Sequence, residues 1–171
     1  MSGVDNLRRL DEKLRTGLSS ATRLRSRLGV LHPATVADEL DQVLTFLQRE
    51  VAPRARAEEA VFYPEVARML GVDLSARMLA EHRDINRLLE GLRELRRETV
   101  AGSAIPAELY RELSALIDLV RAHLRLEDEA LQGMIDAGLA DADAYVLYER
   151  MEIASFEEAA AFAGASLAAA S

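Results

Sequence analysis

Apolar residues recur at steps of three and four along most of the chain, the spacing that places them on one face of a helix. This pattern predicts four long helices, over residues 4–28, 35–70, 73–99 and 106–137. Thr35 and Asp38 resemble a capping box at the start of the second helix, and Pro53 is expected to kink it. The alternation typical of strands is almost absent.

Four long amphipathic helices with short connections predict an all-α fold, an antiparallel up-down four-helix bundle. A short fifth helix is expected from about Asp141, followed by an Ala-rich tail. We therefore assign residues 1–140 to the bundle, and residues 141–171 to a C-terminal helix and tail that packs on the bundle or trails from it.

Composition and charge exclude several classes of function. The net charge of -8 argues against a nucleic-acid partner, and the absence of cysteine excludes thiolate metal sites, disulfides and thiol catalysis. No apolar stretch is long enough to span a bilayer and none resembles a signal peptide, so a cytoplasmic protein without a membrane partner is expected. Only one of the 21 Lys and Arg residues is lysine, which is typical of a bacterial genome rich in GC.

Two segments, residues 54–66 and 123–135, look like copies of one helical unit. The second begins with His123 and has Glu127 four residues later, so that both side chains share a helix face and can reach one metal ion. The first has Glu58 at the matching position but begins with Arg54, whose guanidinium keeps its protons and cannot ligate a metal. Whether the chain holds a metal therefore becomes the central question.

Four polar residues are expected to point into the apolar core, because each lies in phase with buried helix positions: Glu58, His82, His123 and Glu127. Buried carboxylates and imidazoles need partners, and helical bundles commonly satisfy such groups together around a metal ion. Asp128 competes as a fifth position, and Tyr63 or Glu59 could supplement the site. The remaining histidine, His32, precedes a proline and is expected at the surface or as a cap.

Three stretches together resemble the hemerythrin-like (HHE cation-binding) family: residues 52–64, the run Glu81-His82-Arg83, and His123 with Glu127. The likeness covers residues 5 to 136. It implies a four-helix bundle that binds two non-haem irons through inward histidines and bridging carboxylates. It also implies a role in binding oxygen or nitric oxide, in sensing iron or redox state, or in acting on peroxide.

The chain departs from this family pattern at two helices, since no histidine occurs in residues 1–31 and Arg54 stands at a histidine position. The surviving matches are Glu58, His82, His123 and Glu127. A complete di-iron centre is therefore not expected, and the cofactor suggested is one non-haem iron, or manganese or zinc. The partners suggested are the metal ion and a small diatomic or oxidant ligand; oligomeric state stays open.

Three interpretations of this polar cluster remain open. In the first, two histidines and two carboxylates bind a single ion. In the second, Arg54 replaces the metal by pairing with Glu58 and Glu127, and the domain is a metal-free binding or assembly module. In the third, the emptied cavity serves an enzyme as a small-molecule pocket, with His82 or His123 as the acid–base group.

Overall fold

The computed structural model describes the backbone of residues 2–102 and 104–169, and the side chains of these residues as far as residue 160. All regular structure in these ranges is helical. In chain order the elements are α1 (Gly3–Arg9), α2 (Glu12–Arg27), α3 (Pro33–Ala57), the π-helical turn η1 (Glu58–Phe62), α4 (Tyr63–Leu70), α5 (Ser75–Gly102), α6 (Ala107–Asp136) and α7 (Asp141–Ala169).

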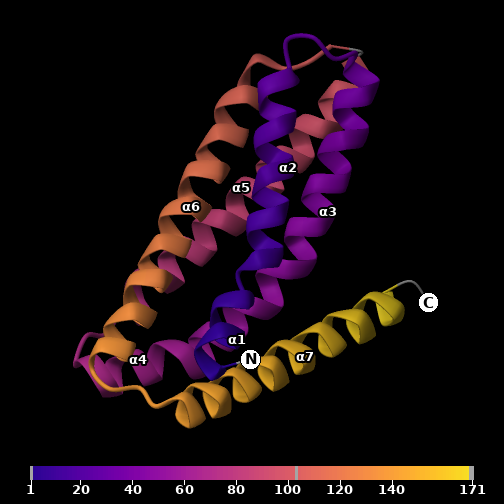
Figure 1. Cartoon of the computed structure of the whole chain (residues 1–171). Coiled ribbons are helices and arrows are strands. Elements are labelled where there is room, and N and C mark those ends of the chain that lie inside the picture. The colour runs from indigo at the N-terminus through magenta and orange to yellow at the C-terminus, as the bar shows by residue number, and fades with distance from the viewer. Residues whose placement is uncertain (1, 103, 170–171) are drawn as a thin grey trace.

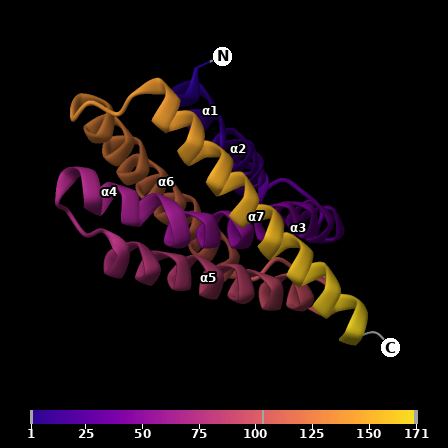
Figure 2. The ribbon, with the colours of Figure 1, turned by 90° about the horizontal axis from the view of Figure 1, so that it is seen from below.

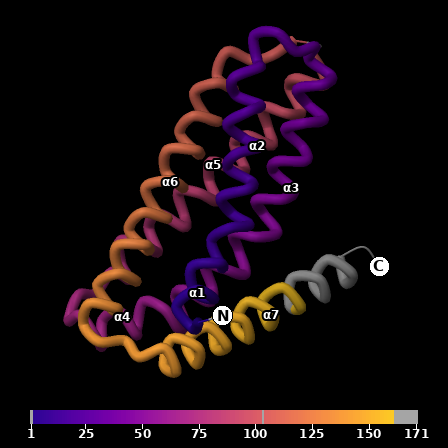
Figure 3. Tube along the Cα trace, in the orientation of Figure 1, coloured from indigo at the N-terminus to yellow at the C-terminus, as the bar shows by residue number. Residues whose placement is uncertain are grey.

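Helices α2, α3, α5 and α6 run alternately up and down as a four-helix bundle (Figure 1), a course that the Cα trace also follows (Figure 3). This confirms the predicted all-α bundle. Among the described residues, no helix combines the length and apolar character needed to cross a membrane.

The first predicted helix is wrong in one respect, because the chain breaks it into α1 and α2 at Leu10 and Asp11. The apolar pattern continues across the break, so periodicity alone does not reveal it. Asp11 stands at the N-cap of α2, yet its side chain makes no capping hydrogen bond. Its carboxylate is directed instead to a buried partner on α3, described below.

The predicted capping box at Thr35 and Asp38 is also wrong. Helix α3 begins earlier, at Pro33, and its cap is His32, whose Nδ1 accepts a hydrogen bond from the Ala34 N–H at 3.3 Å. Proline suits the first helical position because its missing N–H would have no helical partner there. The alternative role predicted for His32, that of a capping residue, is confirmed.

The second rod of the bundle consists of α3, η1 and α4 in succession. Helix α3 continues through Pro53, and regular α-helical hydrogen bonding gives way only at η1. There the N–H of Tyr63 donates to the carbonyl of Glu58, five residues back, as in a π-helix. The rod ends at Gly71, which adopts the left-handed conformation, with φ of 67°, that glycine tolerates best.

Helix α7 crosses the end of the bundle at which α1 and α4 lie (Figures 1 and 2). It buries Leu147 and Met151 in one apolar cluster with Leu7 of α1 and Val61 of η1. The Ser155 hydroxyl donates to the carbonyl of Pro53 at 3.3 Å. At 29 residues α7 is longer than the short helix expected, because alanine, the best helix former, continues it. How the Ala-rich tail packs lies outside the described side chains.

The apolar core has two parts with a polar layer between them. One part is built from α2, α3, α5 and α6 and includes Val51, Ile85 and Leu124. The other lies toward α1, α4 and α7 and includes Ala57, Met78 and Ala130. His82 on α5 falls between Met78 and Ile85, and Glu127 on α6 falls between Leu124 and Ala130, so the polar layer lies where the two parts meet. The fold thus encloses a polar cluster in hydrocarbon.

Candidate metal centre

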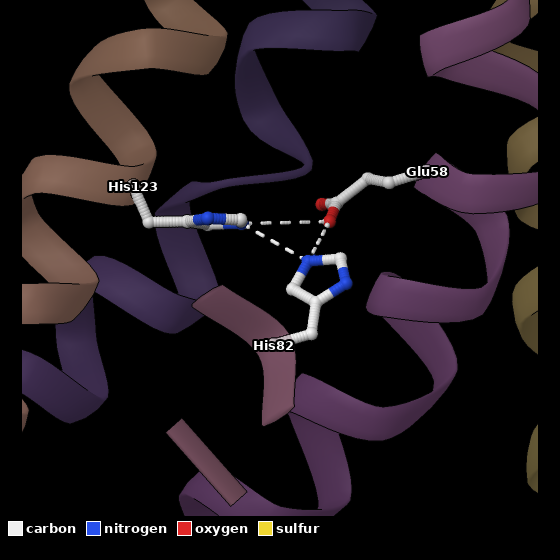
Figure 4. Close-up of side chains that lie close together, drawn as sticks. All are labelled: Glu58, His82 and His123. Atoms are coloured by element: carbon white, nitrogen blue, oxygen red, sulfur yellow. Dashed lines mark hydrogen bonds and ion pairs between the residues drawn. The ribbon is translucent and has the colours of Figure 1, made fainter. Parts of the chain in front are cut away.

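The structure brings the four predicted site residues together and buries all of them. Glu58 is 1 % exposed, His82 5 %, and both His123 and Glu127 3 %. Figure 4 shows the first three converging from η1, α5 and α6. One donor atom from each of these three lies within 4.8 Å of the other two. Glu127, one turn after His123 on α6, has its Oε1 atom 3.6 Å from His123 Nε2.

Both imidazoles are oriented by carboxylates at their outer nitrogen. His82 Nδ1 lies 2.8 Å from Glu59 Oε1, and His123 Nδ1 lies 3.0 Å from Glu81 Oε2. A carboxylate can only accept here, so each Nδ1 carries the proton and donates. In the neutral imidazoles the inner Nε2 atoms therefore present lone pairs, as metal-binding histidines do.

Three lone-pair atoms then face one another with no donor among them. His82 Nε2 lies 3.1 Å from both Glu58 Oε2 and His123 Nε2, and His123 Nε2 lies 3.8 Å from the same Glu58 oxygen. The point equidistant from the corners of this triangle lies about 2.0 Å from each atom, which matches the 2.0–2.2 Å bonds of zinc to nitrogen and oxygen. The donor set fits one metal ion; without one, a proton must separate the two rings.

The π-helical turn gives this cluster its fifth member, Tyr63. In an α-helix, residues five apart point about 140° away from each other. The wider turn of η1 brings them into alignment, so the Tyr63 hydroxyl lies 3.2 Å from Glu58 Oε2. It also lies 3.1 Å from Glu127 Oε1 and 3.3 Å from His82 Nε2, and it can donate to one of the carboxylates at a time. Tyr63 is fully buried, and it joins the predicted residues at the centre of the site.

Arg54 points into the same cluster from the other side. Its Nε lies 2.5 Å from Glu58 Oε1, and its Nη2 lies 3.5 Å from Glu127 Oε2. Both pairings belong to the second of the three interpretations given above. The same Nη2 also forms an ion pair with Asp11 Oδ1, and the Arg54 side chain is only 14 % exposed. One guanidinium thus bridges three buried carboxylates.

Asp11 was missed in the sequence analysis. The sequence does contain a sign of its role. Asp11 lies four residues after Leu7 and three before Leu14, so it shares the buried face of α1 and α2. A carboxylate at such a position needs a buried cation.

Asp128, predicted as a competing position, is excluded from the cluster because its half-exposed carboxylate pairs with Arg15 at 2.7 Å. Glu59 contacts the outer nitrogen of His82 and takes no inner place.

The environment of the cluster shifts the pKa values of its two central carboxyls, Glu58 and Glu127, in opposite directions. Burial raises the pKa of Glu58, but the charge of Arg54 and the hydrogen bonds of the two histidines outweigh burial and hold that pKa below its usual range. Burial and the neighbouring Glu58 charge raise the pKa of Glu127 well above its usual range. Glu58 is therefore the carboxyl that keeps its charge more readily, and Glu127 is the one that takes up a proton more readily.

The cluster is closely packed. The hollow beside Glu58, His82 and His123 has a volume of about 10 Å³, and the one beside Asp11, Arg54 and Glu127 has about 20 Å³. A single water molecule needs roughly 10–15 Å³ of such space. Each hollow has room for an ion or about one water molecule, and neither admits an organic substrate. This argues against the interpretation of the site as an enzyme pocket with His82 or His123 as its acid–base group.

Comparison with known proteins agrees with this geometry. Residues 2–135 match the model of the family described as hemerythrin HHE cation binding domain. The matched range contains every residue of the polar cluster and ends before α7. No curated protein matches the chain, and no solved structure does.

Proposed function

The chain belongs to the hemerythrin HHE cation-binding domain family, and from this premise we propose that it holds a single non-haem metal ion. The ligands proposed are Glu58, His82 and His123, with Glu127 as the adjoining carboxylate. We propose iron as the ion, in a role in oxygen, redox or iron handling. Nitrogen and carboxylate donors also suit manganese and zinc.

One observation carries this proposal. Two histidines whose outer nitrogens are committed as donors aim their lone pairs at each other and at a carboxylate oxygen, at distances of 3.1 to 3.8 Å. Mutually facing acceptors repel unless a metal ion or a shared proton lies between them, and the spacing of these three atoms suits a metal ion. Oriented imidazoles with carboxylates behind them are also the usual support of metal ligands.

The surrounding residues shape what such a site can do. Beside the proposed ligands, the buried Tyr63 hydroxyl donates a hydrogen bond to Glu127 Oε1 at 3.1 Å, so this pair can hold a proton near the site. The hollow beside Glu58, His82 and His123, of about 10 Å³, admits only a molecule about the size of water. Bound iron would supply the capacity to exchange electrons with that molecule, and the protein residues would exclude bulk water and larger molecules.

Metal analysis tests the proposal directly. Protein purified without chelator, and then titrated with Fe(II), Mn(II) or Zn(II), should bind one ion per chain. His82→Ala and His123→Ala should each abolish stoichiometric binding. His32→Ala is the matched control, because this histidine caps α3 away from the cluster and should leave the metal content unchanged. Failure of the unaltered protein to bind any of the three metals would contradict the proposal.

A second function is favoured by a different observation, the ion pairs of Arg54. Its guanidinium already neutralises the carboxylates that a metal would otherwise balance. On this reading the domain is a metal-free binding or assembly module. Absence of metal from the native protein, together with metal uptake by Arg54→His, would support this second function over the first.

A further inference from the structure

A separate, solvent-open hollow lies between the start of the chain, the end of α3 and α7. Its volume is about 500 Å³, which falls within the range of small-molecule sites. Helix α7 forms one wall, through residues between Tyr148 and Ala159. Figure 2 shows α7 passing across this end of the molecule. The hollow contains none of the proposed metal ligands.

The hollow is locally basic on an acidic chain. Three cations with exposed side chains line it, Arg9, Lys13 and Arg49, against two carboxylates, Glu50 and Glu152. The Lys13 ammonium lies 3.9 Å from Glu50, a loose pairing with Lys13 74 % exposed. Within the part of the chain that the structure describes, the guanidinium of Arg49 has no ion-pair partner. The rim therefore offers positive charge to a ligand, in contrast to the net charge of -8 on the whole chain.

The α7 wall is apolar and incompletely covered. Met151 is buried and Tyr148 partly so, but Phe156 is 75 % exposed at the edge of the hollow. Exposing a large aromatic ring costs free energy that a packed ligand would recover. Pro53 continues this apolar surface on α3. A basic rim beside an aromatic wall is complementary to a molecule with one anionic group and one apolar group.

We propose that this hollow binds a small amphipathic organic anion, a carboxylate or sulfonate attached to a ring or short alkyl group. The anionic group pairs with Arg49 and Lys13, and the apolar part packs against Phe156 and Tyr148. Arg54 also borders the hollow, but its charge is committed to the buried carboxylates. The site therefore adjoins the metal centre at Arg54 but binds its ligand through other residues.

The probe is anilinonaphthalene sulfonate, an aromatic anion whose fluorescence rises in an apolar site. The folded, full-length protein should bind one dye per chain in a saturable manner. Arg49→Glu should weaken binding about fivefold to tenfold, because reversing a charge replaces an attraction by a repulsion of similar size. Phe156→Ala should weaken it about threefold to tenfold.

Matched controls locate the effect. Arg87→Glu reverses an exposed charge on α5, outside the hollow, and Tyr110→Ala removes an exposed aromatic ring on α6. Both should bind the dye as the unaltered chain does, with circular dichroism confirming that every variant is folded. Benzoate should displace the dye, and inorganic phosphate should not. Equal affinity of Arg49→Glu and Arg87→Glu, or displacement by phosphate as effective as by benzoate, would overturn the proposal.

Discussion

The two copies of the repeated unit differ in what they bring to the centre of the molecule. The first, on α3 and η1, begins with Arg54 and supplies a permanent positive charge to Glu58. The second, on α6, begins with His123 and supplies a lone pair beside Glu127. The spacing of four residues is the same, and both side chains point inward. One copy neutralises carboxylates with the protein's own cation, and the other leaves an opening for a foreign one.

Under the proposed function, this difference means that a metal site survives the replacement of one histidine by arginine. A guanidinium cannot bind a metal, but it can balance the carboxylates that remain when one cation of a cluster is gone. Asp11, between α1 and α2, gives this guanidinium a further partner. On one side of the cluster Arg54 supplies a permanent charge, and on the other side the histidines supply lone pairs. The following predictions test each side.

The largest effect is expected from Arg54→Met. Removing the guanidinium leaves three buried carboxylates without their cation, so the free energy of unfolding should fall by about 3–5 kcal/mol. Urea denaturation of metal-free protein measures this change. Arg56→Met, at an exposed position of the same helix, is the control and should change stability by less than about 0.5 kcal/mol. A loss below about 1 kcal/mol for Arg54→Met would show that the ion pairs are not structurally important.

A substitution in the second copy should lower metal affinity strongly and change stability less. His123→Gln removes the lone pair but keeps a polar side chain, so metal affinity should fall by more than about 100-fold. The stability of the metal-free protein should change less than in Arg54→Met. Calorimetric titration with Zn(II) measures the affinity. If Arg54→Met abolished metal binding and His123→Gln did not, the roles assigned to the two copies would be reversed.

A smaller effect is expected from the carboxylate behind His123. Glu81→Gln weakens the acceptor for Nδ1–H, so metal affinity should fall about 10- to 100-fold, with one ion per chain retained at saturation. Glu90→Gln, an exposed carboxylate on the same helix, should leave affinity unchanged. Equal affinity of the two variants would show that Glu81 does not orient the ring.

The last prediction concerns the pH dependence of stability in the metal-free protein. Burial lowers the pKa of His123, but the hydrogen bond to Glu58 and the charges of Glu127 and Glu58 outweigh it and raise the pKa to about 9. A raised pKa stabilises the fold fully below the unfolded value of about 6.5, and this contribution is lost as pH rises toward 9. The loss for one proton is at most about 1.4 kcal/mol per pH unit. Urea unfolding across this window should show the decline, and His123→Gln should flatten it; stability that increased with pH would contradict the assignment.

The sequence predicts the bundle well because long apolar periodicity determines which helix faces are buried. It also predicts the inward direction of Glu58, His82 and His123, since each is in phase with neighbouring leucines or other apolar residues. The break at Asp11 escapes this reasoning, because the apolar spacing is continuous across it. The contact between Arg54 and Asp11 joins two rods, and no local pattern records which residues meet across a core.

The backbone geometry of the repeated segments also could not be predicted from the sequence. The two repeated segments look alike in sequence, but the first contains a π-helical turn and the second lies within the regular helix α6. Apolar spacing of three and four residues is compatible with either over such a short stretch. Tyr63 could therefore be named as a possible supplement to the site, but the turn that aligns it with Glu58 could not be predicted.

The turn η1 also bears on how this segment tolerates a change in its length. Deleting one residue from a long helix usually rotates everything beyond the deletion to a wrong face. In η1 the chain already carries one residue more than an α-helix needs, so removing the exposed Ala60 would let ordinary hydrogen bonding resume through α4. The rod would become regular, and Tyr63, then four residues after Glu58, would stay on the same helix face. At this point a shortened chain would gain regular hydrogen bonding and still bring Tyr63 and Glu58 together, so this position should tolerate a deletion better than others on the rod.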